Sequence, residues 1–205
     1  MRDFNRIADI YDHLTRFFFG KNIVKCQTNF IHLIPNGAHI LILGGGTGWI
    51  IDEVKGRCPD CKIWYVDQSS RMISLARTTK NSSGVIFIEG SISDIPVGLN
   101  FDVVITNFFL DLFPEQKLLN LLSSIKVFLK VGGIWLVSDF VNERGWHTGY
   151  LFVMYCFFKL STGIEAWKLP PWEELMGSIG LIEVKHRFFY GGFMKSMLYK
   201  RMTSF

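Results

Sequence analysis

The sequence of 205 residues lacks any apolar run long enough to cross a membrane. Its most apolar run, Tyr150 to Phe158, has about half of the ~20 residues that a membrane-spanning helix needs. The first nine residues, M-R-D-F-N-R-I-A-D, include acidic side chains and no apolar segment. We therefore expect no signal peptide and a cytoplasmic protein.

Cysteine is scarce, with four residues at positions 26, 58, 61 and 156. The spacing Cys58-Pro-Asp-Cys61 suits a metal site or a redox pair. Zinc would need two further ligands, and the sequence has no second C-x-x-C and no H-x-x-x-H, so we predict no metal site. A redox pair would open a helix, whereas this pair precedes the strand-like K-I-W-Y-V, and we favour an inert loop.

Strong charge is also missing, because the net charge is only +4. This balance permits anionic ligands, but no basic run with interleaved aromatic residues points to a nucleic-acid partner. Hydrophobic residues make up 49% and charged residues 20% of the chain, which excludes a disordered protein. The length suits one domain that folds without disulfides or a structural metal.

Apolar runs and helical patterns alternate through most of the chain. We expect strands at 39–43, 62–66, 85–88, 101–106 and 134–137, helices at 3–19, 21–34, 48–56, 70–80 and 115–129, and a turn at 130–133. Strands that alternate with helices predict a parallel α/β sheet with right-handed crossovers.

The C-terminal part has a different pattern. A long apolar helix is expected at 145–163 and a short helix at 172–180, closed by glycine. The strand-like runs 182–190 and 193–201 meet at Gly191-Gly192, which indicates a hairpin. The parallel sheet should therefore end in one antiparallel pair.

The stretch I-L-I-L-G-G-G-T-G places glycines directly after the first strand. Glycine lets the backbone turn sharply and approach a ligand closely, and the helix that follows offers unpaired N–H groups. The second strand ends about twenty residues later in Asp67, whose carboxylate can accept both hydroxyls of a ribose. A dinucleotide motif would need glycine where Trp49 stands, so the pattern favours a nucleoside without a pyrophosphate.

These motifs resemble the class I S-adenosylmethionine-dependent methyltransferases over nearly the whole chain. I-L-I-L-G-G-G-T-G is similar to the family's first motif, W-Y-V-D-Q-S-S-R-M-I-S-L-A-R to the second and V-I-F-I-E-G-S-I-S-D-I-P to the third. F-D-V-V-I-T-N-F-F-L-D-L-F and F-L-K-V-G-G-I-W-L-V-S-D-F are similar to the segments around strands four and five. The opening N-R-I-A-D-I-Y-D-H-L-T-R is similar to the ubiquinone/menaquinone C-methyltransferase branch (methyltransferase types 11 and 25).

The resemblance implies a Rossmann-like doubly wound α/β fold. Its seven-stranded mixed sheet would have the order 3-2-1-4-5-7-6, with strand 7 antiparallel. One domain would span residues 1–205, with an N-terminal helical cap over 1–34 and a helical insert on the substrate side over 140–180.

The resemblance also implies S-adenosylmethionine as cofactor and S-adenosylhomocysteine as product. The residues that would bind the cofactor are Gly44, Gly45, Gly46, Gly48, Asp67, Gln68, Met72, Ser91, Ile92, Asn107 and Tyr11. Within this set Asp67 would hold the ribose and Met72 would pack against the adenine. Ile42 stands where the family usually has an acidic residue, and Ser91 where it usually has aspartate, while Val131 replaces a common proline without consequence.

Methyl transfer from a sulfonium needs alignment more than a catalytic triad, and the sequence shows no triad. A general base is required only if the acceptor must lose a proton, and His147, Asp111 and Asp139 are weak candidates. Asn107-Phe108-Phe109 differs from the N-P-P-F motif of enzymes that methylate amino groups of DNA. This argues against a nucleic-acid acceptor.

Aromatic residues crowd the segment after the fifth strand, which should cover the reactive end of the cofactor. An apolar pocket there would suit a small hydrophobic or aromatic acceptor. The segment leaves contact with a membrane surface open, although its polar face lacks the lysines that such a helix uses. Trp49 either covers the cofactor or packs the helix on the sheet.

We predict a methyltransferase. The alternatives are a non-catalytic protein of the same fold, favoured by Ile42 and Ser91, and a nicotinamide oxidoreductase, which Trp49 opposes.

Overall fold

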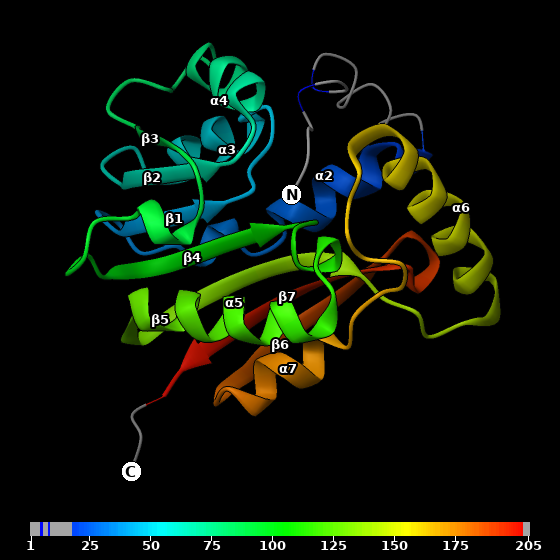
Figure 1. Ribbon diagram of the computed structural model, residues 1–205. Coiled ribbons are helices and arrows are strands. Elements are labelled where there is room, and N and C mark those ends of the chain that lie inside the picture. The colour runs from blue at the N-terminus through cyan, green and yellow to red at the C-terminus, as the bar shows by residue number, and fades with distance from the viewer. Residues whose placement is uncertain (1–4, 6–7, 9–17, 203–205) are drawn as a thin grey trace.

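A computed structural model describes residue 5, residue 8 and residues 18–202, and its centre is one seven-stranded sheet (Figure 1). The strand order is β3-β2-β1-β4-β5-β7-β6, and β7 runs antiparallel to both of its neighbours. The predicted order 3-2-1-4-5-7-6 is therefore confirmed.

The strands lie close to the predicted segments, and their carboxyl ends line up. They are β1 (His39–Leu43), β2 (Lys62–Asp67), β3 (Ile86–Glu89), β4 (Phe101–Asn107), β5 (Leu129–Phe140), β6 (Leu181–Phe189) and β7 (Met194–Arg201). Leu43 at the end of β1 pairs with Val66 on one side and Thr106 on the other. This register brings the residues after β1, β2 and β4 to one edge of the sheet, where open α/β sheets bind ligands.

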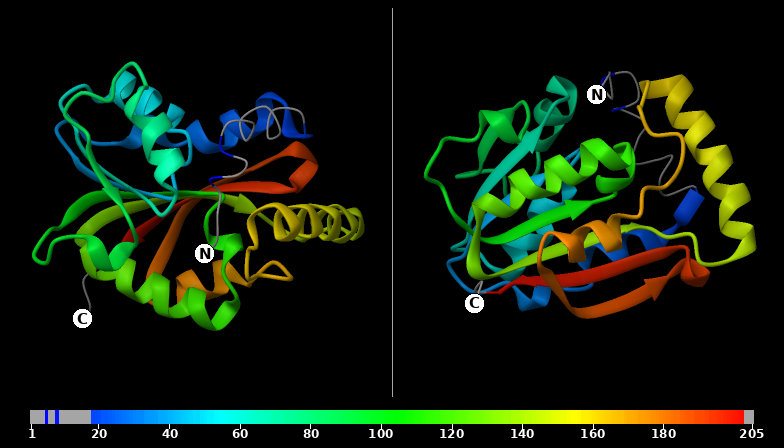
Figure 2. Two further views of the ribbon diagram at one scale, coloured as in Figure 1. Left: turned by 45° about the horizontal axis from the view of Figure 1, so that its top comes forward. Right: turned by 60° about the horizontal axis from the view of Figure 1, so that its bottom comes forward.

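Helices cover both faces of the sheet (Figure 2). They are α2 (Lys21–Thr28), α3 (Trp49–Arg57), α4 (Ser70–Arg77), α5 (Glu115–Phe128), α6 (Gly145–Thr162) and α7 (Trp172–Ser178). Alternation along β1 separates two cores: Leu41 and Leu43 belong to the cluster with α5 and α7, and Ile40 and Ile42 to the cluster with α3 and α4.

A third apolar cluster fixes α6 beyond the carboxyl edge of the sheet. Leu151 and Met154 of α6 share it with Phe19, Ile23 of α2 and Phe193, which precedes β7. Figure 2 shows α6 extending outward from the rest of the molecule. The side of α6 that carries Leu151 and Met154 is thus packed against the rest of the domain.

The helices expected at 70–80 and 172–180 end two or three residues early, at Arg77 and Ser178, and two other boundaries differ more from the prediction. The helix expected at 21–34 ends at Thr28 and is followed by a single 3₁₀ turn over Ile31–Leu33. The turn expected at 130–133 is wrong, because these residues lie inside β5, where Leu129 pairs with Phe101 before a register shift. Most of the helix expected at 3–19 lies outside the described residues.

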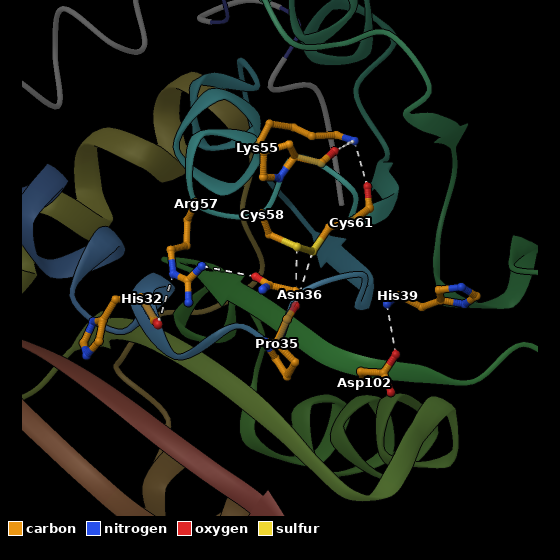
Figure 3. Close-up of a disulfide and its surroundings, with 10 residues drawn as sticks. His32, Pro35, Asn36, His39, Lys55, Arg57, Cys58, Cys61 and Asp102 are labelled. Carbon is orange, nitrogen blue, oxygen red and sulfur yellow. Dashed lines mark hydrogen bonds between the residues drawn. A yellow bond between two sulfur atoms is a disulfide. The ribbon is translucent and has the colours of Figure 1, made fainter.

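The Cys58–Cys61 segment is a disulfide rather than a plain loop (Figure 3). The turn after α3 brings the two Cα atoms to 5.4 Å, a separation that a disulfide can bridge. Both sulfurs are buried, 3.4 and 3.6 Å from the carbonyl oxygen of Pro35, and Lys55 donates to the carbonyl of Cys61. The prediction of an inert loop missed this bond.

Candidate functional site

The glycine loop after β1 turns through three left-handed residues. Gly44, Gly46 and Gly48 have φ of 62°, 66° and 89°. A Cβ on Gly44 would lie 2.3 Å from Cδ2 of Phe109, and one on Gly48 would lie 2.5 Å from Cα of Ala76. A Cβ on Gly46 would meet no heavy atom of the described residues within 4 Å, so none of these residues covers the outer side of the loop at Gly46.

Tyr65 of β2 packs against the glycine loop and is hydrogen-bonded to it. Its hydroxyl donates to the carbonyl of Gly46 at 2.9 Å, and its ring would lie 2.5 Å from a Cβ on Gly45. Tyr65 is fully buried on β2. This role of Tyr65 could not be predicted from the sequence, because an aromatic residue in a buried strand gives no sign of which residues it contacts.

Asp67 is the last residue of β2, and its carboxylate accepts hydrogen bonds from the glycine loop and from the segment that leads into α4. One carboxylate oxygen accepts from the amide of Gly46 at 3.2 Å, and the other accepts from the amide of Ser69 at 2.9 Å. Burial raises the pKa of Asp67 to about 6, and the hydrogen bonds from Ser69 and Gly46 oppose that rise. The carboxylate therefore lies beside the glycine loop, as the motif spacing predicts.

A small pocket of about 70 Å³ lies between these elements. Of the residues predicted to bind a cofactor, it is lined by Gly44, Asp67, Gln68, Ser91 and Ile92. Met72 is instead buried in α4, and Asn107 ends β4 without lining this pocket. Tyr11 lies outside the described residues.

Two phenylalanines close the pocket opposite the carboxylate. Phe109 and Phe113 both line it and pack edge to face, with ring centroids 5.1 Å apart. Phe109 follows Phe108, which has φ of 50°, an uncommon conformation for a residue with a side chain. The sharp turn after β4 thus directs an aromatic ring at the first glycine of the loop.

Ser91 precedes a 3₁₀ turn and is hydrogen-bonded to Asp94 within it. Its hydroxyl donates to Asp94 at 3.0 Å, and its amide donates to the same carboxylate oxygen at 2.7 Å. These bonds lower the pKa of Asp94. A carboxylate therefore stands three residues beyond the position where the sequence analysis noted its absence.

Asp139 and Asp111 form a buried carboxyl pair behind the end of β4. Asp139 accepts from the amides of Phe140 at 2.8 Å and Leu110 at 3.0 Å, and burial raises its pKa to about 7. Burial and the neighbouring Asp139 raise the pKa of Asp111 well above its usual range. Through the amide of Leu110, which donates to Asp139, this pair braces the turn that carries Phe109.

His147 lies in the first turn of α6 and is fully buried. Its Nδ1 accepts from the amides of Glu143 and Arg144 at 3.1 and 3.3 Å. Burial and the charge of Arg144 lower its pKa. The geometry is that of a helix-terminal cap, and a role as general base stays a prediction, as it does for Asp111 and Asp139.

Trp49 opens α3 and packs, half-buried, against the core under the sheet. No group of three His, Cys, Asp or Glu side chains that could hold a metal ion occurs in the described part of the chain.

Comparison with known proteins identifies the relatives of this chain. The family model described as "Methyltransferase domain" matches residues 40–133, which run from β1 into β5. The demethylmenaquinone methyltransferase of Thermotoga maritima is 31% identical over 121 residues, which cover 57% of this chain and 52% of that protein. The chain spans between 38% and 52% of the length of several curated relatives.

Two solved structures share the fold at low sequence identity. A putative methyltransferase from Haloferax volcanii, in complex with the Trm112 methyltransferase activator, has a TM-score of 0.75 and 13% identity and covers 99% of both chains. The N-methyltransferase NodS from Bradyrhizobium japonicum, in complex with S-adenosylhomocysteine, has a TM-score of 0.61 and 16% identity and covers 85% of this chain and 84% of that one.

Proposed function

Because the chain belongs to the class I S-adenosylmethionine-dependent methyltransferases, we propose that it transfers the methyl group of that cofactor to a small hydrophobic or aromatic acceptor. The observation that carries the proposal is the pairing of Asp67 with the glycine loop. The carboxylate lies 3.2 Å from the amide of Gly46, and the Cβ side of Gly46 is open.

The chemistry of these residues fits a nucleoside. A carboxylate that already accepts from two amides has lone pairs left for two ribose hydroxyls, because each oxygen can accept more than one hydrogen bond. Ser91 and Ile92 line the same pocket, and they would lie against the adenine. The solved neighbour that holds S-adenosylhomocysteine supports this assignment.

The size of the pocket sets a condition on binding. Ligand pockets usually measure ~300–1,000 Å³, and this one measures about 70 Å³. Phe109 and Phe113 line the pocket, and their rings would have to turn away to make room for the cofactor. We therefore propose that binding includes a movement of the segment after β4.

The cofactor would supply an electrophilic methyl group that is displaced in line. The chain's own residues would hold the ribose at Asp67, receive the nucleoside along Gly46 and exclude water with Phe109, Phe113 and the α6 side of the molecule. Such positioning accounts for much of the rate gain expected in two-substrate reactions, roughly 7–11 kcal/mol. No proton transfer by the protein is required unless the acceptor must lose one.

A non-catalytic protein of the same fold is the second candidate. Ile42, which stands in place of an acidic residue, is fully buried among apolar side chains and contributes no polar group to the site. The small volume of the pocket also favours a non-catalytic protein.

Transfer of a labelled methyl group separates the two candidates. The protein is incubated with [methyl-³H]S-adenosylmethionine and a cell extract, and the products are divided between water and organic solvent. We expect label in the organic phase with the wild type and none with Asp67→Asn. If all of the label stays in the water phase with the unreacted cofactor, while the protein binds S-adenosylhomocysteine, the non-catalytic candidate is favoured.

A further inference from the structure

A groove of about 750 Å³ lies beside α6 and shares no described lining residue with the nucleoside pocket. Its walls come from the residues after β5, the first half of α6, residues 167–171 and the first turns of α5 and α7 (Figure 1). In the part of the chain that the structure describes, no helix, α6 included, is long and apolar enough to cross a membrane. The volume of the groove falls within the ~300–1,000 Å³ of small-molecule sites, so it can hold a ligand of that size.

Aromatic rings line the groove, and their polar ends are hydrogen-bonded within the protein. The Tyr155 hydroxyl donates to the carbonyl of Asp111 at 3.2 Å, and Nε1 of Trp172 donates to the carbonyl of Phe140 at 2.9 Å. Both side chains are buried. Because these hydrogen bonds use the polar hydrogens, the two residues offer the groove apolar ring surface. The other aromatic residues of the lining are Phe152 and Trp167.

The charged side chains of the groove disfavour an anion. They are Glu115, Glu143, Glu173, Glu174 and Lys168. Glu173 is neutralised by Lys195, whose Nζ lies 2.5 Å from its carboxylate. Among the described residues, no salt bridge is made to the other three carboxylates. The positive ends of the neighbouring helices offset part of this negative charge, so the groove repels an anion without requiring a cation.

We propose that this groove is a second ligand site, which takes a small aromatic molecule without negative charge. The rings of Phe152 and Tyr155 would contact the aromatic body of the ligand. Glu143, which precedes α6, and Glu174, in the first turn of α7, would exclude anions from two sides. These two glutamates therefore determine the specificity of the site.

One segment, residues 109–115, walls both the groove and the nucleoside pocket. Phe109 and Phe113 line the pocket, and Glu115 lines the groove. Between them, the carbonyl of Asp111 accepts from Tyr155 of the groove. A molecule in the groove thus lies next to the segment that would move when the cofactor binds. Its use as the methyl acceptor rests on the proposed function, whereas its binding does not.

The experiment titrates the full chain, without cofactor, with three probes of similar shape and different charge. They are 1-naphthylmethanol, 1-naphthylmethylamine and 1-naphthoate, and calorimetry measures their affinities. Phe152→Ala removes a ring from the groove. Its matched control is Leu160→Ala, which truncates an apolar side chain of the same helix that does not line the groove.

A second pair of variants tests the charge. Glu143→Gln/Glu174→Gln removes two carboxylates from the groove and keeps their shape. The matched control is Glu53→Gln/Glu183→Gln, which changes two exposed glutamates that do not line the groove. Thermal melting shows whether each variant folds.

We expect the wild type to bind the alcohol and the amine, and to bind naphthoate about fivefold more weakly, because of the unpaired carboxylates. Glu143→Gln/Glu174→Gln should gain about threefold in affinity for naphthoate, and its control should gain nothing. Phe152→Ala should bind the alcohol about three- to tenfold more weakly than Leu160→Ala does, because it loses an aromatic contact.

Wild-type protein that binds none of the probes, or that binds naphthoate as tightly as the alcohol, would overturn the proposal. Equal affinities within either pair of variants would also overturn it. A dimer that Phe152→Ala dissociates, without probe binding, would overturn it in favour of a second copy in the groove. Since no titration contains the cofactor, a failure of methyl transfer does not change these outcomes.

Discussion

Alanine at Gly46 and at Gly37 should cost the same stability and differ in ligand binding. Gly46 and Gly37 have nearly the same backbone conformation, with φ of 66° and 70°. Among the residues that the structure describes, none has a heavy atom within 4 Å of a Cβ built on either glycine. A methyl group on a left-handed residue costs roughly 1 kcal/mol, and this lowers Tm by about 2–4 °C in a chain of this size.

Binding should separate the two variants because only Gly46 lies at the proposed nucleoside site. Its amide donates to Asp67, and the ligand would contact the protein backbone on the open side of Gly46. A methyl group there would occupy that space. We expect Gly46→Ala to lose at least ~10-fold in affinity for S-adenosylhomocysteine, or about 1.4 kcal/mol, and Gly37→Ala to lose nothing.

Calorimetric titration with S-adenosylhomocysteine measures the affinities, and thermal unfolding measures the stability cost. Equal affinities for the two variants, with equal losses of Tm, would show that the ligand does not touch the loop. A much larger loss of Tm for Gly46→Ala would show that the space around this glycine is not open, and the reasoning would fail at that step.

Four further predictions concern Asp67, the Cys58–Cys61 disulfide and Phe109. The affinity for S-adenosylhomocysteine should rise from pH 5 to pH 7, because Asp67 ionises near pH 6 and the ionised form accepts the ribose hydroxyls, and Asp67→Asn should remove this dependence in calorimetry. The pKa of Asp67 is higher in the folded than in the unfolded protein, so folding favours the protonated carboxyl and the protein loses stability as the pH rises. Between pH 4 and pH 7 the unfolding free energy of the wild type should fall by about 2–3 kcal/mol relative to that of Asp67→Asn, as measured by urea denaturation. Reduction of Cys58–Cys61 should lower the unfolding free energy by about 2 kcal/mol, as expected for so short a loop, and the double variant Cys58→Ser/Cys61→Ser should not respond to reductant in the same assay. Phe109→Leu should enlarge the pocket and tighten binding of S-adenosylhomocysteine several-fold, and calorimetry that shows weaker binding would mean that the wild-type ring contacts the ligand favourably.

The sheet could be predicted because its signals are local. Strands β1 and β2 are short apolar runs bounded by glycine or a charged residue, and the Asp67 position follows from its place at the end of β2. The β5 extension over residues 130–133 was missed, because Gly132-Gly133 is typical of a turn. Pairing of Leu129 with Phe101 overrides that local preference.

Features that depend on distant contacts could not be read from the sequence. The position of Phe109 against Gly44 depends on how β1 and β4 align, and the support from Tyr65 depends on the path of the glycine loop. The aromatic character of α6 was apparent from the sequence, but the packing of Leu151 and Met154 against Phe19 and Phe193 was not.

A crystal structure of the protein with S-adenosylhomocysteine tests the central claim most directly. The account predicts the ribose hydroxyls within hydrogen-bond distance of the Asp67 carboxylate, the nucleoside along the open side of Gly46, and the rings of Phe109 and Phe113 turned out of the pocket. Ligand bound elsewhere on the molecule, or the two rings still filling the pocket at saturating ligand, would contradict it.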